Sequence, residues 1–215
     1  MIQRNHLTNS DALAFLKSLP DKCCDIFTDP PYNVGKDYGD MVDDNRSDYP
    51  EWITEILTEC KRVSNVLIVY VPKKWNLLYW NVLGEDFREI ILPFRPRGAI
   101  RYGYSNQFNK LLTNATPSGT PVLNVWENMP QPAHGFFFRE ETYNHAGYTS
   151  EAITNKAIVE LCSSDVICDP FMGTGTTAVC AVKNGKSYIG SELNPEYIKI
   201  AEDRLKRHSY ESVYF

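Results

Sequence analysis

Two apolar segments of the chain each end in an aspartate that is followed by proline. Residues 25–28 (Asp-Ile-Phe-Thr) run into Asp29-Pro30-Pro31-Tyr32, and residues 166–168 (Val-Ile-Cys) run into Asp169-Pro170-Phe171. Proline has no backbone N–H to donate, so neither segment can continue as a central strand or a helix beyond its aspartate. Each aspartate is therefore expected at the carboxyl end of a strand, which is where open α/β sheets bind their ligands.

Strand patterns and helix patterns alternate along most of the chain. Strands are expected over residues 2–7, 25–29, 65–71, 165–170 and 186–192, and helices over residues 11–19, 50–62, 150–162, 175–185 and 194–208, with a further helix and strand over residues 73–92. Asp48 stands where the cap of the second helix is expected. This alternation predicts an α/β fold with a doubly wound, mostly parallel sheet.

The composition of the 215-residue chain is that of an ordinary globular enzyme, with 43% hydrophobic and 23% charged residues. No apolar run approaches the roughly 20 residues that a membrane-spanning helix needs, and the N-terminal residues are too polar for a secretory signal peptide. Six cysteines show no metal-ligand spacing. We therefore expect reduced thiols, no metal, no membrane and a cytoplasmic protein.

A glycine-rich loop follows the second aspartate and opens a helix. The spacing Gly173-x-Gly175-x-x-Ala178 satisfies the dinucleotide fingerprint, and Glu192 ends the next expected strand, where a ribose-binding acid belongs. The N-terminus of a helix offers free N–H groups to an anion. No lysine follows the glycines, which excludes a phosphate-binding loop of nucleoside triphosphatases. The loop alone fits an NAD enzyme, a flavoprotein or a methyltransferase.

The two motifs together are more specific than either one. Asp29 in DPPY, Asp169 in DPFMGTGTT and Glu192 resemble the S-adenosylmethionine-dependent DNA amino-methyltransferases, in the permuted (beta) order in which DPPY precedes the glycine loop. The resemblance covers the first 35 residues and residues 143–207. It implies a Rossmann-like methyltransferase core formed by residues 1–92 and 145–215, and a target-recognition region at residues 93–144.

The resemblance also implies roles for individual residues. The resemblance assigns catalysis to Asp29, Pro30, Pro31 and Tyr32. It assigns cofactor binding to Asp11, Asp29, Asp169, Pro170, Phe171, Gly173, Gly175, Thr176, Thr177 and Glu192. In this assignment the glycine loop surrounds the methionine part of the cofactor, and Glu192 accepts from the ribose. Asp11 either contacts the cofactor's adenine amino group or only caps a helix.

The chemistry of an exocyclic amino group explains the acid and the prolines. Its lone pair is conjugated into the ring, so the nitrogen is a poor nucleophile. A carboxylate and a proline-fixed carbonyl, each accepting one N–H, favour a pyramidal nitrogen and stabilise the charge that develops on it. Tyr32 is expected to stack on the base, which must leave the duplex to be reached.

The middle segment is basic in an acidic protein with a net charge of −5. Residues 93–139 contain five basic residues and one acid, Glu127, which gives a local charge of +4. The basic residues are Arg95, Arg97, Arg101, Lys110 and Arg139. With the interleaved aromatic residues, this pattern fits either a DNA-contact surface or a solvated loop. We assign Arg95, Arg97, Arg101 and Lys110 to DNA binding.

The expected reaction is site-specific methylation of the adenine N6 amino group in DNA. Alternatives are an N4-cytosine methyltransferase, a non-catalytic nucleic-acid-binding relic of the fold, and a nicotinamide-dependent oxidoreductase, which would leave DPPY without a role. Aspartate before Pro-Pro-Tyr favours adenine. The middle segment is short, so a second copy of the chain could complete the recognition surface, and a cognate restriction endonuclease could accompany the enzyme. Residues 145–158 lack the proline-lysine element that family members usually carry there, which puts cofactor affinity in question.

Overall fold

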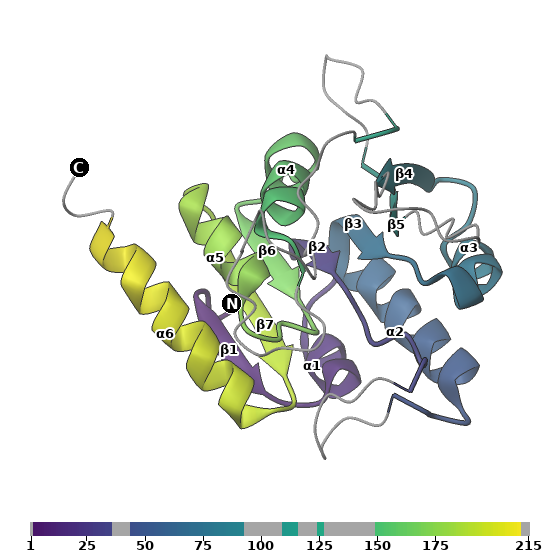
Figure 1. The fold of residues 1–215 in the computed structure, drawn as a ribbon, viewed down its shortest axis with the longest axis horizontal. Helices are drawn as coiled ribbons and strands as arrows, with labels where there is room; N and C mark the ends of the chain where they lie inside the picture. Colours follow the sequence, from purple (N-terminus) through teal and green to yellow (C-terminus); the bar gives the residue numbers. More distant parts are fainter. Residues whose placement is uncertain (1, 36–43, 93–108, 116–123, 127–148, 212–215) are drawn as a thin grey trace, which may run out of the picture.

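A central sheet with helices on both faces forms the core of the protein (Figure 1). The computed structural model describes residues 2–35, 44–92, 109–115, 124–126 and 149–211. The predicted α/β fold class is confirmed by this arrangement.

The sheet has seven strands in the order β1-β7-β6-β2-β3-β5-β4. Their bounds are β1 (His6–Asn9), β2 (Cys24–Thr28), β3 (Ser64–Tyr70), β4 (Arg88–Leu92), β5 (Asn109–Thr113), β6 (Val166–Asp169) and β7 (Ser187–Glu192). Neighbouring strands pair in parallel, except that β5 is antiparallel to both β3 and β4. From β2 the chain continues to β3 on one side, and from β6 it continues to β7 on the other. The topological switch point, where such folds bind ligands, therefore lies between β2 and β6.

The helices form two layers. Helices α1, α2 and α3 contact one another in series on one face of the sheet, and α4, α5 and α6 do so on the other. Their bounds are α1 (Ala12–Ser18), α2 (Tyr49–Val63), α3 (Asn76–Leu83), α4 (Glu151–Leu161), α5 (Thr176–Lys183) and α6 (Pro195–Glu211), with a short 3₁₀ helix, η1 (Lys73–Trp75), before α3. Helix α2 shows why such helices form: Ile53, Ile56, Leu57 and Cys60 repeat at helical spacing, and all four are fully buried.

The middle of the chain departs from the sequence analysis. Residues 109–113 fall inside the region assigned to target recognition, yet they form β5 and lie between two core strands. Leu111 and Leu112 are fully buried, and Trp126 is also buried. Such a short apolar run has no periodicity long enough to predict a strand. The rest of the predicted target-recognition region lies largely outside the described residues.

Two smaller expectations also need correction. The first strand was expected at residues 2–7 but forms at His6–Asn9, where it pairs with β7. Asp48 does precede α2, but its side chain caps no N–H. It pairs instead with the Arg46 guanidinium, whose Nη2 lies 2.8 Å from Asp48 Oδ2.

Candidate active site

Acidic side chains stand at the carboxyl ends of four neighbouring strands. Asp11 follows β1, Glu192 ends β7, Asp169 ends β6 and Asp29 follows β2, and these strands are consecutive in the sheet. The structure therefore brings together, along one sheet edge, acids that are up to 181 positions apart in the sequence (192 − 11). Asp29 and Asp169 flank the switch point.

Asp29 is held by hydrogen bonds to both of its carboxylate oxygens. The Tyr32 hydroxyl donates to Oδ1 over 2.5 Å, and the Thr149 hydroxyl donates to Oδ2 over 3.1 Å. Burial and the nearby Asp29 carboxylate raise the pKa of Tyr32, so its hydroxyl stays protonated and remains a donor. Tyr32 is half-buried and its hydroxyl is engaged with the Asp29 carboxylate; its expected stacking on a base stays a prediction.

The turn after Asp29 is fixed by aromatic side chains of the helical layer. The Tyr49 hydroxyl donates to the carbonyl of Pro31 over 3.0 Å, and the Trp75 indole N–H donates to the carbonyl of Tyr32 over 3.1 Å. The rings of Tyr49 and Trp75 pack against each other with centroids 4.9 Å apart. The Pro31 carbonyl is therefore directed toward Tyr49 in the helical layer, which leaves the carbonyl of Pro30 as the candidate acceptor for a target amino group.

Asp44 fixes the chain beyond Tyr32. Its buried carboxylate accepts from the backbone N–H of Asn33 over 2.7 Å and from that of Val34 over 3.1 Å. Asn33 has a φ of 54°, a conformation that asparagine adopts more readily than most residues. The sequence indicated only a polar loop here, because an acid eleven residues away gives no local signal.

Asp169 joins the two halves of the switch point. The Thr28 hydroxyl, on β2, donates to Asp169 Oδ1 over 2.8 Å, and the Thr177 hydroxyl, on α5, donates to Oδ2 over 2.6 Å. The backbone N–H of Phe171 also donates to Oδ1, over 3.0 Å. Burial, with a smaller contribution from the nearby Asp29 charge, raises the pKa of Asp169 to about 7 although these hydrogen bonds lower it. Asp169 thus couples the glycine loop and α5 to strand β2, which leads into the DPPY motif.

The glycine loop packs against the protein as well as facing the sheet edge. Gly175 has a φ of +87°, and a Cβ there would lie 2.7 Å from Cβ of Ala201 on α6. Glycine is therefore required at this position by backbone conformation and helix packing. We expected the glycines to admit a ligand close to the backbone; at Gly175 the observed close approach is to α6.

Arg204 supports the glycine loop from α6. Its guanidinium is buried and donates to the carbonyl of Thr174 over 2.6 Å and to the hydroxyl of Thr176 over 3.2 Å. Its Nη2 forms an ion pair with Glu151 Oε1 on α4 at 2.7 Å. Sequence analysis missed Arg204, because an arginine in a charged amphipathic helix looks like a surface residue.

Glu192 is oriented by backbone groups. Its Oε2 accepts from the N–H of Gly173 over 2.9 Å, and its Oε1 accepts from the N–H of Asn194 over 2.8 Å. Burial raises its pKa, which the backbone donors oppose. Each carboxylate oxygen has a further lone pair for a ligand hydroxyl.

Asp11 caps helix α1, as one of the two interpretations predicted. Its Oδ1 accepts from the N–H of Leu13 over 2.9 Å and from that of Ala14 over 3.1 Å. Its contact with a cofactor adenine stays a prediction.

The carboxylate acceptors along this edge of the sheet fit S-adenosylmethionine. That cofactor carries a sulfonium cation, an ammonium group, ribose hydroxyls and an adenine amino group, all of which suit carboxylate acceptors. Three carboxylates lie at the carboxyl ends of adjacent strands: Asp11 just after β1, Glu192 at the end of β7 and Asp169 at the end of β6. No group of three or more His, Cys, Asp or Glu side chains in the described ranges is arranged to hold a metal ion.

The predicted DNA-contact residues fall in different places. Arg95, Arg97 and Arg101 lie outside the described residues. Lys110 lies on β5, where its Nζ forms an ion pair with Glu89 Oε1 at 2.7 Å. A lysine whose charge is balanced within the sheet is a weaker candidate for a phosphate contact than an unpaired one.

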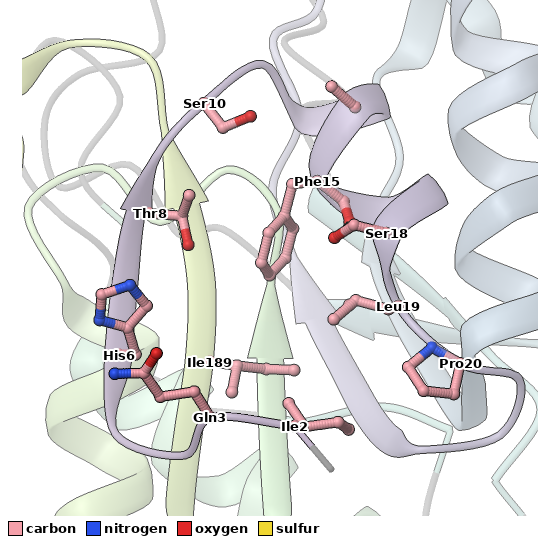
Figure 2. Close-up of a pocket in the computed structure, with 11 residues that line it drawn as sticks. Ile2, Gln3, His6, Thr8, Ser10, Phe15, Ser18, Leu19, Pro20 and Ile189 are labelled. Atoms are coloured by element: carbon pink, nitrogen blue, oxygen red, sulfur yellow. The ribbon is translucent and has the colours of Figure 1, made fainter.

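A pocket of about 580 Å³ opens between β1, β7 and α1 (Figure 2). His6 and Thr8 line it from one face of β1, Ser10 lines it just beyond that strand, and Phe15 and Ser18 line it from α1. It includes none of the predicted catalytic or cofactor residues. The pocket therefore lies beside the candidate site rather than within it.

Comparison with known proteins decides the family. The model of the N6/N4 methyltransferase family, described as DNA methylase, matches residues 65–203, which is more than half of the chain. The chain belongs to this family of DNA methylases. DNA adenine methyltransferase YhdJ of Escherichia coli (strain K12) is 28% identical over 96% of this chain and 84% of its own. Type II methyltransferase M.HpaI of Haemophilus parainfluenzae is 28% identical over 91% of this chain and 72% of its own.

Solved structures show the same fold. The complex of the methylase M1.HpyAVI with SAM superimposes with a TM-score of 0.65 at 20% identity, covering 93% of this chain and 98% of the other. The PvuII DNA methyltransferase (cytosine-N4-specific) has a TM-score of 0.66 at 15% identity, covering 95% of this methylase and 87% of the other. The predicted family, Rossmann-like fold and DNA methyltransferase activity are confirmed. Among the described residues, no helix has both the length and the apolar character to cross a membrane.

Proposed function

We propose that this methylase transfers a methyl group from S-adenosylmethionine to the N6 amino group of adenine in DNA. The observation that carries the proposal is the position of Asp29, in DPPY, next to the cofactor loop, with Thr28 bonded directly to Asp169 over 2.8 Å. The relative YhdJ is named a DNA adenine methyltransferase. The PvuII enzyme, with the same fold, is cytosine-N4-specific, so the preference for adenine rests on the aspartate of the motif and not on the fold.

Asp29 and the Pro30 carbonyl would hold the target amino group. The Tyr32 hydroxyl, which now donates to Asp29 Oδ1, would leave that oxygen to an N–H of the base and turn its ring toward the base. The Thr149 hydroxyl would stay on Oδ2 and keep the carboxylate in place. Bound S-adenosylmethionine supplies an electrophilic methyl group.

The Asp29 carboxylate stabilises the charge on the target nitrogen during transfer and then accepts its proton. As the nitrogen gains the methyl group it becomes positive, and the fixed Asp29 carboxylate stabilises that charge without reorganising. The alkylated nitrogen then loses one proton, which Asp29 accepts and passes to solvent.

The cofactor would be held along the sheet edge from β6 to β1. Glu192 would accept from the ribose hydroxyls, Asp11 from the adenine amino group, and the backbone N–H groups that open α5 would face the carboxylate. Pro170 and Phe171 would line the pocket. The Phe171 ring already packs edge-on against Trp52, with centroids 5.8 Å apart, which fixes that wall.

Other partners belong to the same proposal. A second copy of the chain would complete a recognition surface for which the middle segment is short, and a cognate endonuclease would accompany the methylase, as the names of type II relatives suggest. DNA modification of this kind would take place in the cytoplasm of a prokaryotic cell.

Labelled methyl groups test the assignment of base and donor. The protein is incubated with S-adenosylmethionine labelled in its methyl group and with unmethylated DNA, and the digested nucleosides are separated. We expect the label in N6-methyl-2′-deoxyadenosine. Label in N4-methylcytosine would overturn the adenine assignment, and label in neither, with DNA still bound, would favour the non-catalytic relic.

A further inference from the structure

Two adjacent lysines stand beside the catalytic turn. Lys73 and Lys74 follow the carboxyl end of β3, the strand next to β2, and both side chains are exposed. Lys74 Nζ lies 3.4 Å from the carbonyl oxygen of Asn33, and the next residue, Trp75, donates to the carbonyl of Tyr32. The Lys74 ammonium thus lies against the turn that carries Asp29, and Lys73 is the neighbouring exposed residue.

The charge of this pair is not balanced by carboxylates. Within the described residues, neither Lys73 nor Lys74 forms an ion pair with an acid. Six other lysines of the described ranges do pair with a carboxylate; they are Lys17, Lys110, Lys156, Lys183, Lys199 and Lys206. A protein with a net charge of −5 needs local positive charge wherever it holds a polyanion.

We propose that Lys73 and Lys74 bind the DNA phosphates that flank the extruded target nucleotide. This inference rests on the proposed function. A base that enters the site at Asp29 remains bonded to its sugar and its two phosphates, which must therefore lie at the mouth of the site. Phosphate contacts of this kind set the register of the DNA and carry no sequence information. The pair would hold the backbone while the base leaves the duplex.

Lys74 is also preorganised for this contact. Its ammonium group lies 4.7 Å from the centroid of the Trp75 ring, and this cation–π contact limits where the charge can go. Trp75 in turn is bonded to the catalytic turn through Tyr32. Phosphate binding and the geometry of the turn are therefore linked through one side chain.

The test is a DNA-binding titration at several salt concentrations. Each phosphate contact contributes about 0.9 to the slope of log affinity against log salt, so Lys73→Ala/Lys74→Ala should flatten the slope by about 1.8. With equal affinities of variant and wild type at about 1 M salt, this difference in slope corresponds to a loss of affinity of about 200-fold at about 0.05 M salt and about 30-fold at about 0.15 M. S-adenosylmethionine affinity and the melting temperature should not change.

A matched control separates contact from net charge. Lys199→Ala/Lys206→Ala makes the same change in charge on α6, which lies at the other end of the sheet (Figure 1), and should leave the slope unchanged. Lys74→Arg, which keeps the charge, should retain most of the affinity. Equal slopes for the Lys73/Lys74 variant and the wild type would overturn the proposal. The phosphate groups of DNA are the same at every base. Methyl label on cytosine in the transfer assay would therefore refute the adenine assignment and leave the phosphate contacts of Lys73 and Lys74 untouched.

Discussion

Arg204 is a buried cation on α6 that joins the glycine loop to α4, and its replacement by methionine should be strongly destabilising. Arg204 has 2% of its side chain exposed and an ion pair of 2.7 Å with Glu151. Removing one member of a buried ion pair typically costs about 3–5 kcal/mol. Glu151 retains a second partner, Lys183, at 2.8 Å, which limits the loss on that side. The carbonyl of Thr174 would lose a donor at the same time.

We therefore expect Arg204→Met to lower the free energy of unfolding by about 3–5 kcal/mol in urea titrations. Lys183→Met is the control, because its ion pair with Glu151 is more exposed and surface pairs are worth about 0–1 kcal/mol. If enough folded protein remains, the variant should also bind S-adenosylmethionine at least tenfold more weakly, since Thr174 and Thr176 belong to the glycine loop.

A pH series distinguishes lost charge pairing from lost packing. Burial works against the Glu151 carboxylate, but Lys183 and Arg204 together lower its pKa in the folded protein. This stabilisation is present above the unfolded pKa of about 4.3 and is lost as the pH falls through the lower folded value. The difference between wild type and Arg204→Met should therefore shrink in acid. A difference below 1 kcal/mol at pH 7, or one that is constant down to pH 3, would refute the reasoning.

Three further predictions concern the carboxylates of the switch point. Thr149→Val removes a hydrogen bond to the charged Asp29 and should slow methyl transfer about 10- to 100-fold in single-turnover assays, whereas Thr149→Ser should restore it; equal rates for Val and Ser variants would contradict this. Asp29→Asn should slow transfer by about 100-fold or more with DNA affinity unchanged, and a near wild-type rate would remove Asp29 from catalysis. The pKa of Asp169 is about 7 in the folded protein and about 3.9 in the unfolded chain. Between these pH values the folded protein binds one proton more than the unfolded chain does, so its free energy of unfolding should fall as the pH rises through this window. Asp169→Asn should lose that slope in urea titrations from pH 4.5 to 8; parallel profiles would show that Asp169 does not titrate there.

The two aspartate-proline motifs were predictable from sequence because their signal is local. Proline cannot donate to the ladder of a central strand, so Asp29 and Asp169 were expected at strand ends. Continuous apolar runs and helical spacing likewise gave most of the strands and helices, with β2 and α2 within one or two residues of expectation. The family resemblance depended on these same stretches.

The contacts that hold the site were not predictable, because each joins distant parts of the chain. Thr149 reaches Asp29 across 120 positions, and Thr28 reaches Asp169 across 141. Strand β5 was missed for a related reason: its five residues are stabilised by pairing with β3 and β4 and not by any pattern of their own.

By itself, the sequence determined where strands stop, which residues carry acid and hydroxyl groups, and that a methylase of DNA amino groups was the best match. Tertiary structure alone decided which of these groups touch: that both oxygens of Asp29 are occupied, that Asp169 is buried with a raised pKa, that Arg204 lies inside the protein and that Lys110 is neutralised by Glu89. The physical reason is the range of the interactions. Backbone conformation follows from neighbouring residues, whereas desolvation and charge pairing depend on every element that packs around a group.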